Sequence, residues 1–207
     1  ESLSNFKFVF DSQPVYQQMN KENKLVPGLP SGFEDRWDKK LLLKKKLLKA
    51  IENNFIKFGA EALETPSFEI SENIGSFLAE DEANPMSDVF SFKDRDKNIT
   101  LRYDLSSPLA RFYAQNNQEL PSIFKRYQIQ NVFRNEKAGN GRYREFMQAD
   151  FDIVGNVNPA QANAELCNLI SSTLLDCGLK KDQFTINVSN RKICLLYTSD
   201  AADEAIG

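Results

Sequence analysis

The sequence predicts an α+β fold, in which a mainly antiparallel sheet carries helices on one face. Two pairs of strand-like runs are each joined by a polar turn, and helical segments are inserted between the pairs. This order differs from the alternating βαβ rhythm of a parallel nucleotide-binding sheet. With 207 residues, of which 41% are hydrophobic and 27% charged, the chain is long enough for one domain with a buried core.

The first expected element is a helix over residues 37–58. Apolar residues recur there at every fourth position and form one stripe, made of Leu43, Leu47, Ile51 and Phe55. Gly59 follows, where a glycine commonly ends a helix. The lysines between residues 39 and 49 favour a solvated helix face over a nucleic-acid surface. A short strand over residues 60–65 comes next and stops at Pro66.

The middle of the chain predicts a hairpin and a helix. Residues 89–92 and 99–103 alternate between apolar and polar side chains on either side of the polar segment 93–98. Ser107 and Pro108 then supply an N-cap and a first-turn proline, so we expect a helix from there to about residue 115.

The longest strands are expected over residues 127–136 and 142–154, and the Gly-rich segment 137–141 joins them into a second hairpin. Asn158 and Pro159 begin another helix, which ends at Gly178. A last strand is expected over residues 184–188.

The composition excludes several kinds of chemistry. The chain contains no histidine, which removes Ser-His-Asp and Cys-His nucleophile systems and His-ligated catalytic zinc. Three scattered cysteines, Cys167, Cys177 and Cys194, predict reduced thiols and a cytoplasmic protein. No segment reaches the length of a membrane span, so no membrane partner is expected. A net charge of −3 gives no overall basic footprint for nucleic acid.

Both ends of the sequence look unlike natural termini. The chain begins with Glu1, and residues 1–26 show no clear period and receive no role. Residues from Cys194 to about 204 read like a translated sequencing adapter, so we interpret 194–207 as a non-native tail; a native short helix or loop is the alternative. The sequence therefore predicts a fragment of a longer protein.

The second long hairpin carries an unusual set of polar side chains. Alternation places Arg134 and Glu136 on one face, and the returning strand adds residues at every second position: Arg142, Arg144, Phe146, Gln148, Asp150 and Asp152. A solvated outer face would explain the charges, but not an aromatic ring and an amide among them. Arginine forks suit phosphate oxygens and a ring suits a nucleobase, so the face predicts a nucleoside triphosphate site. The segment 139–141 lacks the residues of a phosphate-binding P-loop.

The same residues carry a family resemblance. The string Phe133-Arg134-Asn135-Glu136, followed by Arg142-x-x-x-Phe146, resembles motif 2 of class II aminoacyl-tRNA synthetases. The longer block 132–148 is similar to the histidyl-tRNA synthetase family in particular, as are 101–111, 88–92 and 29–35. Glu64-Thr65-Pro66 resembles motif 1, the element through which this family dimerises. The likeness covers about residues 29–193 and has an alphaproteobacterial character, so residues 27–193 are expected to be part of a class II catalytic domain.

The resemblance implies an ATP site. Arg134 would hold the α-phosphate together with the carboxylate of the amino acid, and it would be the catalytic residue. Glu136 would meet the adenine edge and Arg142 the γ-phosphate. Phe146 would stack on adenine. Catalysis would consist of positioning and of electrostatic stabilisation by Arg134 and Mg²⁺, with no metal ligand assigned in this chain.

The resemblance also implies a site for L-histidine. Asp104 and Ser106, on one face of the strand that enters the helix at Ser107, would bind its α-amino group together with Gln148. Asp152 would accept the imidazole N–H. Family members more often carry Glu at the positions of Asp104 and Asp152. The implied reaction forms histidyl-adenylate and then transfers histidine to tRNA(His) in a homodimer built on motif 1.

Two other interpretations stay open at the level of sequence. The first is the regulatory subunit of ATP phosphoribosyltransferase, a histidine-binding paralogue that does not aminoacylate. The second is a class II synthetase for another amino acid. The resemblance further implies that motif 3, a second catalytic arginine and the anticodon-binding domain are missing, so the sheet is expected to be incomplete and the fragment inactive and marginally stable.

Overall fold

The computed structural model describes residues 27–74 and 89–189. The chain divides into two compact units, Glu1–Pro30 and Ser31–Gly207. In the first unit only residues 27–30 are described, and they form irregular chain. The predictions for residues 1–26 and 194–207, including Cys194, concern segments outside the described residues. Every helix and strand below belongs to the second unit.

The described elements follow the α+β order that the sequence predicts. In chain order they are α1 (Asp38–Lys57), β1 (Glu61–Ala62), β2 (Phe68–Ile70), the 3₁₀ helix η1 (Ser71–Ile74), β3 (Ser91–Asp94), β4 (Lys97–Leu101), α2 (Ser106–Asn116), β5 (Ile123–Phe133), β6 (Glu145–Gly155) and α3 (Pro159–Asp176). The fold class is confirmed.

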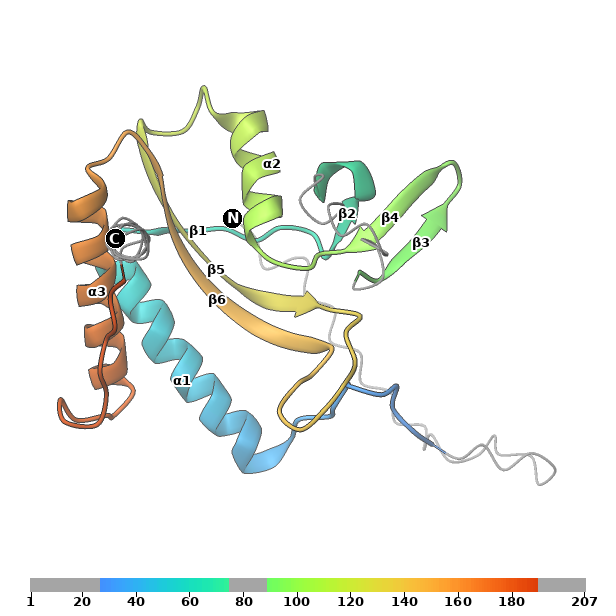
Figure 1. Ribbon diagram of the computed structural model, residues 1–207, viewed down its shortest axis with the longest axis horizontal. Coiled ribbons are helices and arrows are strands. Elements are labelled where there is room, and N and C mark those ends of the chain that lie inside the picture. Colours follow the sequence, from blue (N-terminus) through green and yellow to red (C-terminus); the bar gives the residue numbers. More distant parts are fainter. Residues whose placement is uncertain (1–26, 75–88, 190–207) are drawn as a thin grey trace, which may run out of the picture. The chain divides into compact units, whose positions relative to one another are not determined.

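The strands form two sheets. The larger has the order β1-β5-β6, and its two long strands pair antiparallel from Ile123 opposite Gly155 to Phe133 opposite Glu145. The short β1 joins the other side of β5 in parallel, which the sequence did not predict. The smaller sheet has the order β2-β4-β3 and is antiparallel. Figure 1 shows β5 and β6 as one long curved ribbon.

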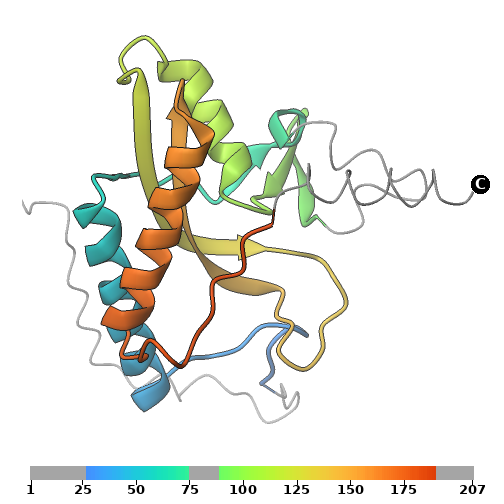
Figure 2. The ribbon, with the colours of Figure 1, turned by 60° about the vertical axis from the view of Figure 1, so that its left-hand side comes forward.

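Helices cover both sides of this ribbon, so the expectation of helices on one face is wrong. The helices α1 and α3 lie side by side on one side of the ribbon (Figures 1 and 2), and Lys125 of β5 forms an ion pair with Glu165 of α3 there. On the other side, the ring of Phe112 in α2 lies 6.3 Å from that of Phe124. Neighbouring residues of β5 therefore contact different helices, as strand alternation requires.

The main apolar core fills the space between the ribbon and α1 and α3. Phe55 is 6% exposed, and its ring lies 5.7 Å from the ring of Tyr127 and 5.5 Å from that of Phe151. Leu169 of α3 is 2% exposed in the same cluster. The expected stripe of α1 is thus buried at its C-terminal end, whereas Leu43 is 59% exposed.

The helix ends follow the sequence signals with one exception. Gly59 has a φ of +79° directly after α1, and the side chain of Asn158 accepts hydrogen bonds from the first turn of α3. The exception is α2, which begins at Ser106. Its capping side chain is that of Asp104, whose Oδ1 accepts a hydrogen bond from the backbone N–H of Ser107 at 3.1 Å. Ser107 is therefore not the N-cap.

Several strand boundaries differ from expectation. The first hairpin is confirmed, but its turn is only Arg95 and Asp96. The long strands end at Phe133 and begin again at Glu145, so residues 134–144 form a loop and not strand ends. Residues 184–188 are not a strand, because the described chain offers this segment no partner strand. Alternation of apolar side chains alone does not satisfy a strand's backbone groups.

Candidate active site

The face of the ribbon that points toward α2 is polar. Strand register places Arg126 opposite Asp152, Gln128 opposite Asp150, and Gln130 opposite Gln148. These pairs occupy alternate positions, so their side chains share one face. Six polar residues in register on a face covered by a helix indicate a binding surface, because a packing surface would carry apolar side chains.

Beyond the ribbon, the loop 134–144 continues this surface. The backbone N–H of Arg134 donates to the carbonyl of Arg144 at 2.9 Å, and that of Arg144 donates to the carbonyl of Gly32 at 2.8 Å. The Arg144 side chain lies against Gly32 and places its guanidinium 4.7 Å from the centre of the Phe90 ring. Arg144 therefore anchors the base of the loop and is not part of the nucleotide-facing set predicted from alternation.

Arg134 and Phe146 lie on the same side, which confirms the geometric expectation on which the sequence interpretation depends. The Arg134 guanidinium carbon lies 5.1 Å from the centre of the Phe146 ring and 4.4 Å from that of Tyr103. Both distances are in the range of cation–π contacts. The guanidinium is thus held against two rings, and its Nε donates to the carbonyl of Tyr103 at 3.4 Å.

Glu136 and Arg142 also come together, across the loop. Arg142 Nη2 lies 2.6 Å from Glu136 Oε2, and the other carboxylate oxygen accepts a hydrogen bond from the Tyr103 hydroxyl at 3.2 Å. The pair lies at a cavity of about 270 Å³, whose lining includes Arg134, Glu136, Arg142 and Phe146. All four residues that the sequence assigns to ATP therefore line one cavity.

The acidic residues assigned to the amino acid gather around a buried arginine. Arg126 has no exposed surface, and its Nη2 lies 2.8 Å from Asp152 Oδ2. Its guanidinium also donates to the carbonyl of Leu105 at 3.0 Å and to the side-chain oxygen of Gln128 at 3.1 Å. The charges of Asp104, Asp150 and Asp152 all act on it. Three carboxylates around one guanidinium leave an acidic environment that suits a cationic ligand.

Burial sets the protonation behaviour of this cluster. It raises the pKa of Asp150 and of Asp152 above the ordinary aspartate value, while the charge of Arg126 lowers both and the other carboxylates raise them. Burial lowers the pKa of Arg126, and the aspartates oppose that shift. The carboxylates therefore ionise less readily than exposed ones, and Arg126 is the group that favours their charged form.

Three buried polar atoms of the cluster make no hydrogen bond within the described residues. They are Nε of Arg126, Oε1 of Gln148 and Oδ2 of Asp152, the last of which is close to Arg126 but poorly aligned for a hydrogen bond. Gln148 donates to Asp150 Oδ1 at a long 3.5 Å. Buried polar groups are usually paired, so Oε1 of Gln148 is an acceptor that a polar ligand or water can satisfy.

Ser106 is the predicted site residue whose expected position is wrong. The sequence placed it on a strand with Asp104, but the strand ends at Leu101 and Ser106 is the exposed first residue of α2. Asp104 lies in the short segment between them and couples electrically to Arg126. Of the two, Asp104 belongs to the acidic cluster.

Sequence reasoning missed the supporting residues on β5. Gln128 donates to Thr65 Oγ1 at 2.8 Å and lies next to Gln130, which accepts from the Thr65 backbone N–H at 3.1 Å. The missed signal was the alternation of Arg126, Gln128 and Gln130, hidden because the strand was expected to start at Tyr127. Tyr103 gave no local signal, since it lies in irregular chain.

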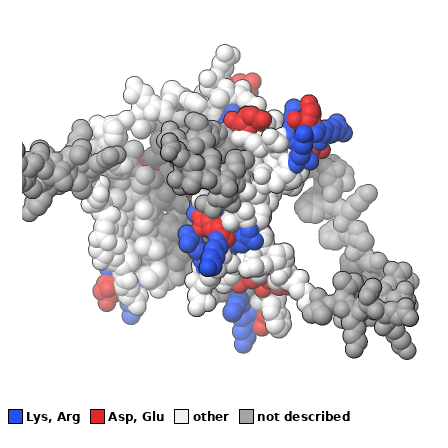
Figure 3. All heavy atoms as spheres, turned by 45° about the vertical axis from the view of Figure 1, so that its right-hand side comes forward, with Lys and Arg blue, Asp and Glu red and all other residues white. Residues whose placement is uncertain are grey.

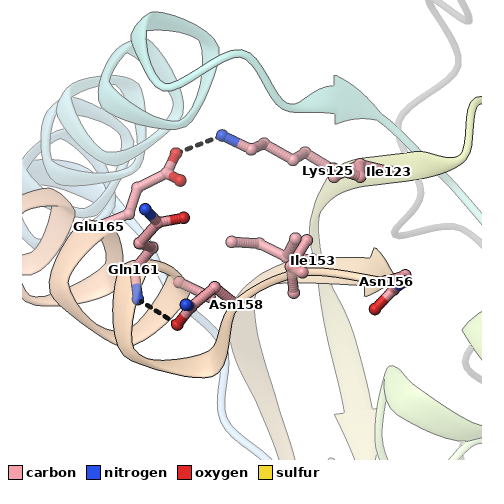
Figure 4. A pocket seen from close by; sticks show the side chains of 9 residues that line it. Ile123, Lys125, Ile153, Asn156, Asn158, Gln161 and Glu165 are labelled. Atoms are coloured by element: carbon pink, nitrogen blue, oxygen red, sulfur yellow. Dashed lines mark hydrogen bonds and ion pairs between the residues drawn. The ribbon is translucent and has the colours of Figure 1, made fainter.

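A second cavity, of about 320 Å³, lies where Ile123, Lys125 and Ile153 of the ribbon meet the start of α3. Figure 4 shows Lys125 reaching Glu165, and Asn158 bound to the backbone of Gln161. These residues have odd positions on β5 and β6 and thus belong to the opposite face from Arg126. Lys125 and Glu165 pair with each other there and the side chain of Asn158 caps α3, so these groups serve the packing of α3 against the ribbon.

The described surface carries charges of both signs (Figure 3). On the side shown in Figure 3, acidic and basic side chains lie in small mixed groups. None of the helices in the described ranges is long and apolar enough to cross a membrane. Residues 27–74 and 89–189 contain no group of three His, Cys, Asp or Glu side chains arranged for a metal ion. Cys167 and Cys177 are free thiols.

Comparison with known proteins identifies the family. The sequence profile described as histidyl-tRNA synthetase matches residues 32–204. The chain belongs to the histidyl-tRNA synthetase family. It is 81% identical over 175 residues to the Histidine--tRNA ligase of Pelagibacter ubique, which is 84% of this chain and 38% of that protein. This agrees with the alphaproteobacterial character expected from the sequence.

Solved structures place the fold in the same family. Histidyl-tRNA synthetase from Nostoc sp. PCC 7120 superposes with a TM-score of 0.60 and 27% identity, over 72% of this chain and 34% of that one. A protein from Bacillus halodurans, titled ATP phosphoribosyltransferase regulatory subunit/histidyl-tRNA synthetase, gives a TM-score of 0.64 at 22% identity, over 83% and 40%. That second likeness shows the fold alone. The chain thus spans less than half the length of these relatives.

Proposed function

We propose that this chain supplies the ATP and histidine sites of a histidine–tRNA ligase. The observation that carries the proposal is the placement of Arg134 against Phe146, in one cavity with Glu136 and Arg142, at the end of a ribbon face that continues to Asp152. A cavity lined by groups that suit a nucleotide, beside an acidic cluster that suits an amine, fits a reaction that joins an amino acid to ATP.

The ATP half of the site uses the loop and the first residues of β6. Phe146 stacks on adenine and Glu136 meets its amino edge, while Arg134 holds the α-phosphate and Arg142 the γ-phosphate of a bent nucleotide. In the ligand-free chain Glu136 and Arg142 pair with each other at 2.6 Å. Binding of ATP replaces this pair with contacts to adenine and phosphate.

The histidine half uses the acidic cluster. Asp104 and Gln148 bind the α-amino group, with Ser106 at the rim, and Asp152 accepts the imidazole N–H. Gln148 Oε1, which makes no hydrogen bond among the described residues, is an acceptor for the α-amino group. A buried acceptor rejects amino acids that cannot donate to it, because the acceptor would stay unpaired.

The reaction proceeds in two transfers. A carboxylate oxygen of histidine attacks the α-phosphorus of ATP, which forms the adenylate bond and releases pyrophosphate. A terminal ribose hydroxyl of tRNA(His) then attacks the acyl carbon, and AMP leaves. Arg134 contacts both reacting groups and stabilises the charge that develops on the α-phosphate. No protein nucleophile takes part, in keeping with a chain that lacks histidine.

The part of the chain that the structure describes offers Mg²⁺ no ligand set. The described residues hold no group of three potential ligands, and the carboxylate of Glu136 is already engaged by Arg142 and Tyr103. Mg²⁺ therefore remains an expected companion of the ATP phosphates, and no step above depends on a residue of this chain holding it.

The homodimer is proposed to form through the motif 1 region. At the N-terminal half of α1, Leu42 is 65% and Leu43 59% exposed, on the element that leads to Glu64-Thr65-Pro66. Exposed leucines side by side indicate a surface that another chain covers. We also propose that residues 27–193 form part of the catalytic domain and that the protein works in the cytoplasm, where its thiols stay reduced.

The second candidate is a histidine-binding regulatory subunit of ATP phosphoribosyltransferase. It is kept because the fold matches the Bacillus halodurans structure whose title names that subunit. The cavity with Arg134, Glu136, Arg142 and Phe146 favours ATP use and hence the ligase.

The test uses a chimera in which this chain replaces the matching segment of the full-length Pelagibacter ubique relative. We expect ATP–pyrophosphate exchange that depends on histidine and on none of the other amino acids. Exchange with a different amino acid contradicts the histidine site. Histidine binding without exchange supports the regulatory subunit. Aminoacylation of tRNA(His) by the same chimera tests the second transfer.

A further inference from the structure

Arg126 lies within the acidic cluster, yet none of the contacts proposed for ATP or histidine uses it. On β5 it lies opposite Asp152 of β6, and its side chain has no exposed surface. A fully buried guanidinium is expensive to maintain unless it is paired, so its presence on the floor of a binding face needs an explanation.

The contacts of Arg126 fix its orientation. It donates to the carbonyl of Leu105, directly before α2, and to Gln128 on its own strand, while Nη2 approaches Asp152 at 2.8 Å. The carbonyl of Leu105 joins the guanidinium to the segment that carries Asp104. Arg126, on β5, therefore links the two chain segments from which the acidic residues come, β6 and the segment before α2.

All charged groups that face Arg126 are acidic. Asp150 and Asp152 approach from β6 and Asp104 from the segment before α2, whereas its neighbours Gln128 and Leu105 are uncharged. Three carboxylates without a cation would repel one another and would shift toward their neutral forms. One cation leaves the cluster acidic, with two negative charges when all three are ionised.

We infer that Arg126 is a positioning residue: its ion pair with Asp152 holds that side chain in place in its charged form, and Arg126 does so without touching the substrate itself. This inference rests on the proposed function. Its consequence is that the site recognises histidine through charged carboxylates, so its affinity for the cationic amine depends on the buried guanidinium below them.

The first test needs no substrate and uses the 207-residue chain. Carboxyl-carbon NMR follows the titration of Asp104, Asp150 and Asp152 in the original chain and in Arg126→Leu, with assignment by single Asp→Asn variants. Loss of an opposite charge at this distance should raise the pKa of Asp152 by about one unit or more. An unchanged titration of Asp152 in folded Arg126→Leu overturns the inference.

Arg102 provides the matched control. It is also a buried arginine, but it donates to the carbonyls of Asn131 and Thr65, and its acidic neighbours are Glu64 and Glu69. Arg102→Leu should lower the melting temperature without moving the titration of Asp152. An equal shift in both variants would mean that loosening of the fold, and not the charge of Arg126, sets the pKa.

The second test measures histidine-dependent exchange by the chimera across pH. Arg126→Leu should raise KM for histidine about tenfold or more with a smaller change in kcat, and should move the acidic limb of kcat/KM to higher pH. Arg126→Lys, which keeps the charge but loses the fork, should keep the limb and give an intermediate KM.

A wild-type KM in Arg126→Lys overturns the geometric role, even if Arg126→Leu does not fold. A chimera that shows no exchange contradicts the proposed function, whereas the NMR titration still decides the role of Arg126. The two failures are therefore distinguishable.

Discussion

The two faces of the β5–β6 ribbon are made by the same strands and are used in opposite ways. On one face Tyr127 and Phe151 pack with Phe55 of α1 in the apolar core. On the other face Arg126 and Asp152, each one residue away along its strand, form a buried ion pair. Alternation along a strand thus separates a stabilising surface from a binding surface by a single residue.

The two faces contribute to the free energy of folding with opposite signs. Burial of aromatic and aliphatic side chains on the α1 and α3 side stabilises the chain. On the other side, Arg126 is buried and the carboxylates near it are partly buried. These charged groups lose hydration on folding, which opposes folding. Substitutions on the first face should therefore lower stability, and those on the second should lower activity while leaving the fold intact.

The largest expected effect is on the apolar face. Phe55→Ala removes a ring that is 6% exposed and should lower the free energy of unfolding by about 3–5 kcal/mol. Thermal or denaturant unfolding of the 207-residue chain measures it. Phe92→Ala is the control, because that ring is 48% exposed and its loss should cost far less. Equal losses from the two variants would contradict the placement of the core.

The next effect is on the polar face. Arg134→Ala in the chimera should reduce histidine-dependent pyrophosphate exchange by roughly 100–1000-fold, which is ~2.7–4 kcal/mol of transition-state stabilisation. Far-ultraviolet circular dichroism and the melting temperature should change little. Arg95→Gln, in the exposed turn between β3 and β4, removes an equal charge away from the cavity and serves as the control. An active Arg134→Ala enzyme would refute its catalytic role.

A smaller effect should have the opposite sign for stability. Burial raises the folded-state pKa of Asp150 above its unfolded value near 3.8, so the ionised carboxylate opposes folding at neutral pH. Asp150→Asn should therefore raise the melting temperature at pH 7. It should at the same time weaken histidine binding.

The pH dependence provides the check on that variant. Original chain and variant should converge as pH falls through the raised folded pKa, because Asp150 then takes up a proton, and the advantage should vanish below the unfolded value. Asp182→Asn, on an exposed turn after α3, controls for the loss of a surface charge. A gain that is independent of pH would contradict the explanation by burial.

The smallest effect belongs to neither face. Lys49 and Glu52 pair at 2.9 Å on the outer surface of α1, where the Lys49 side chain is 66% exposed. Lys49→Gln should change the free energy of unfolding by no more than about 0.5 kcal/mol, and less at high salt. Denaturant unfolding at two salt concentrations measures this. A change of several kcal/mol would show that an exposed ion pair on α1 contributes as much to stability as a buried core side chain. That result would contradict the placement of the stabilising contacts in the core.

The sequence predicted the elements whose signals are local. Periodic apolar residues and Gly59 marked α1, Asn158 marked the start of α3, and alternation marked the long hairpin. The spacing around Arg134 and Phe146 also placed the cavity correctly, because both positions depend on the strands immediately beside them.

The features it missed depend on distant partners. The two-residue β1 exists because Glu61 and Ala62 pair with Arg126 and Tyr127, which no local pattern announces. Residues 184–188 alternate like a strand but have no partner among the described strands. Arg126 lay just outside the strand expected from residue 127, and it is instead a buried residue of β5, because β6 and the segment before α2 cover it.

A structure of the chimera with ATP and histidine bound tests the central claim most directly, since it shows which face of the ribbon holds the ligands. We predict adenine against Phe146, the α-phosphate against Arg134, and the imidazole toward Asp152 above Arg126. A nucleotide bound elsewhere, such as in the cavity beside Lys125, or a histidine away from Asp152, would contradict the account.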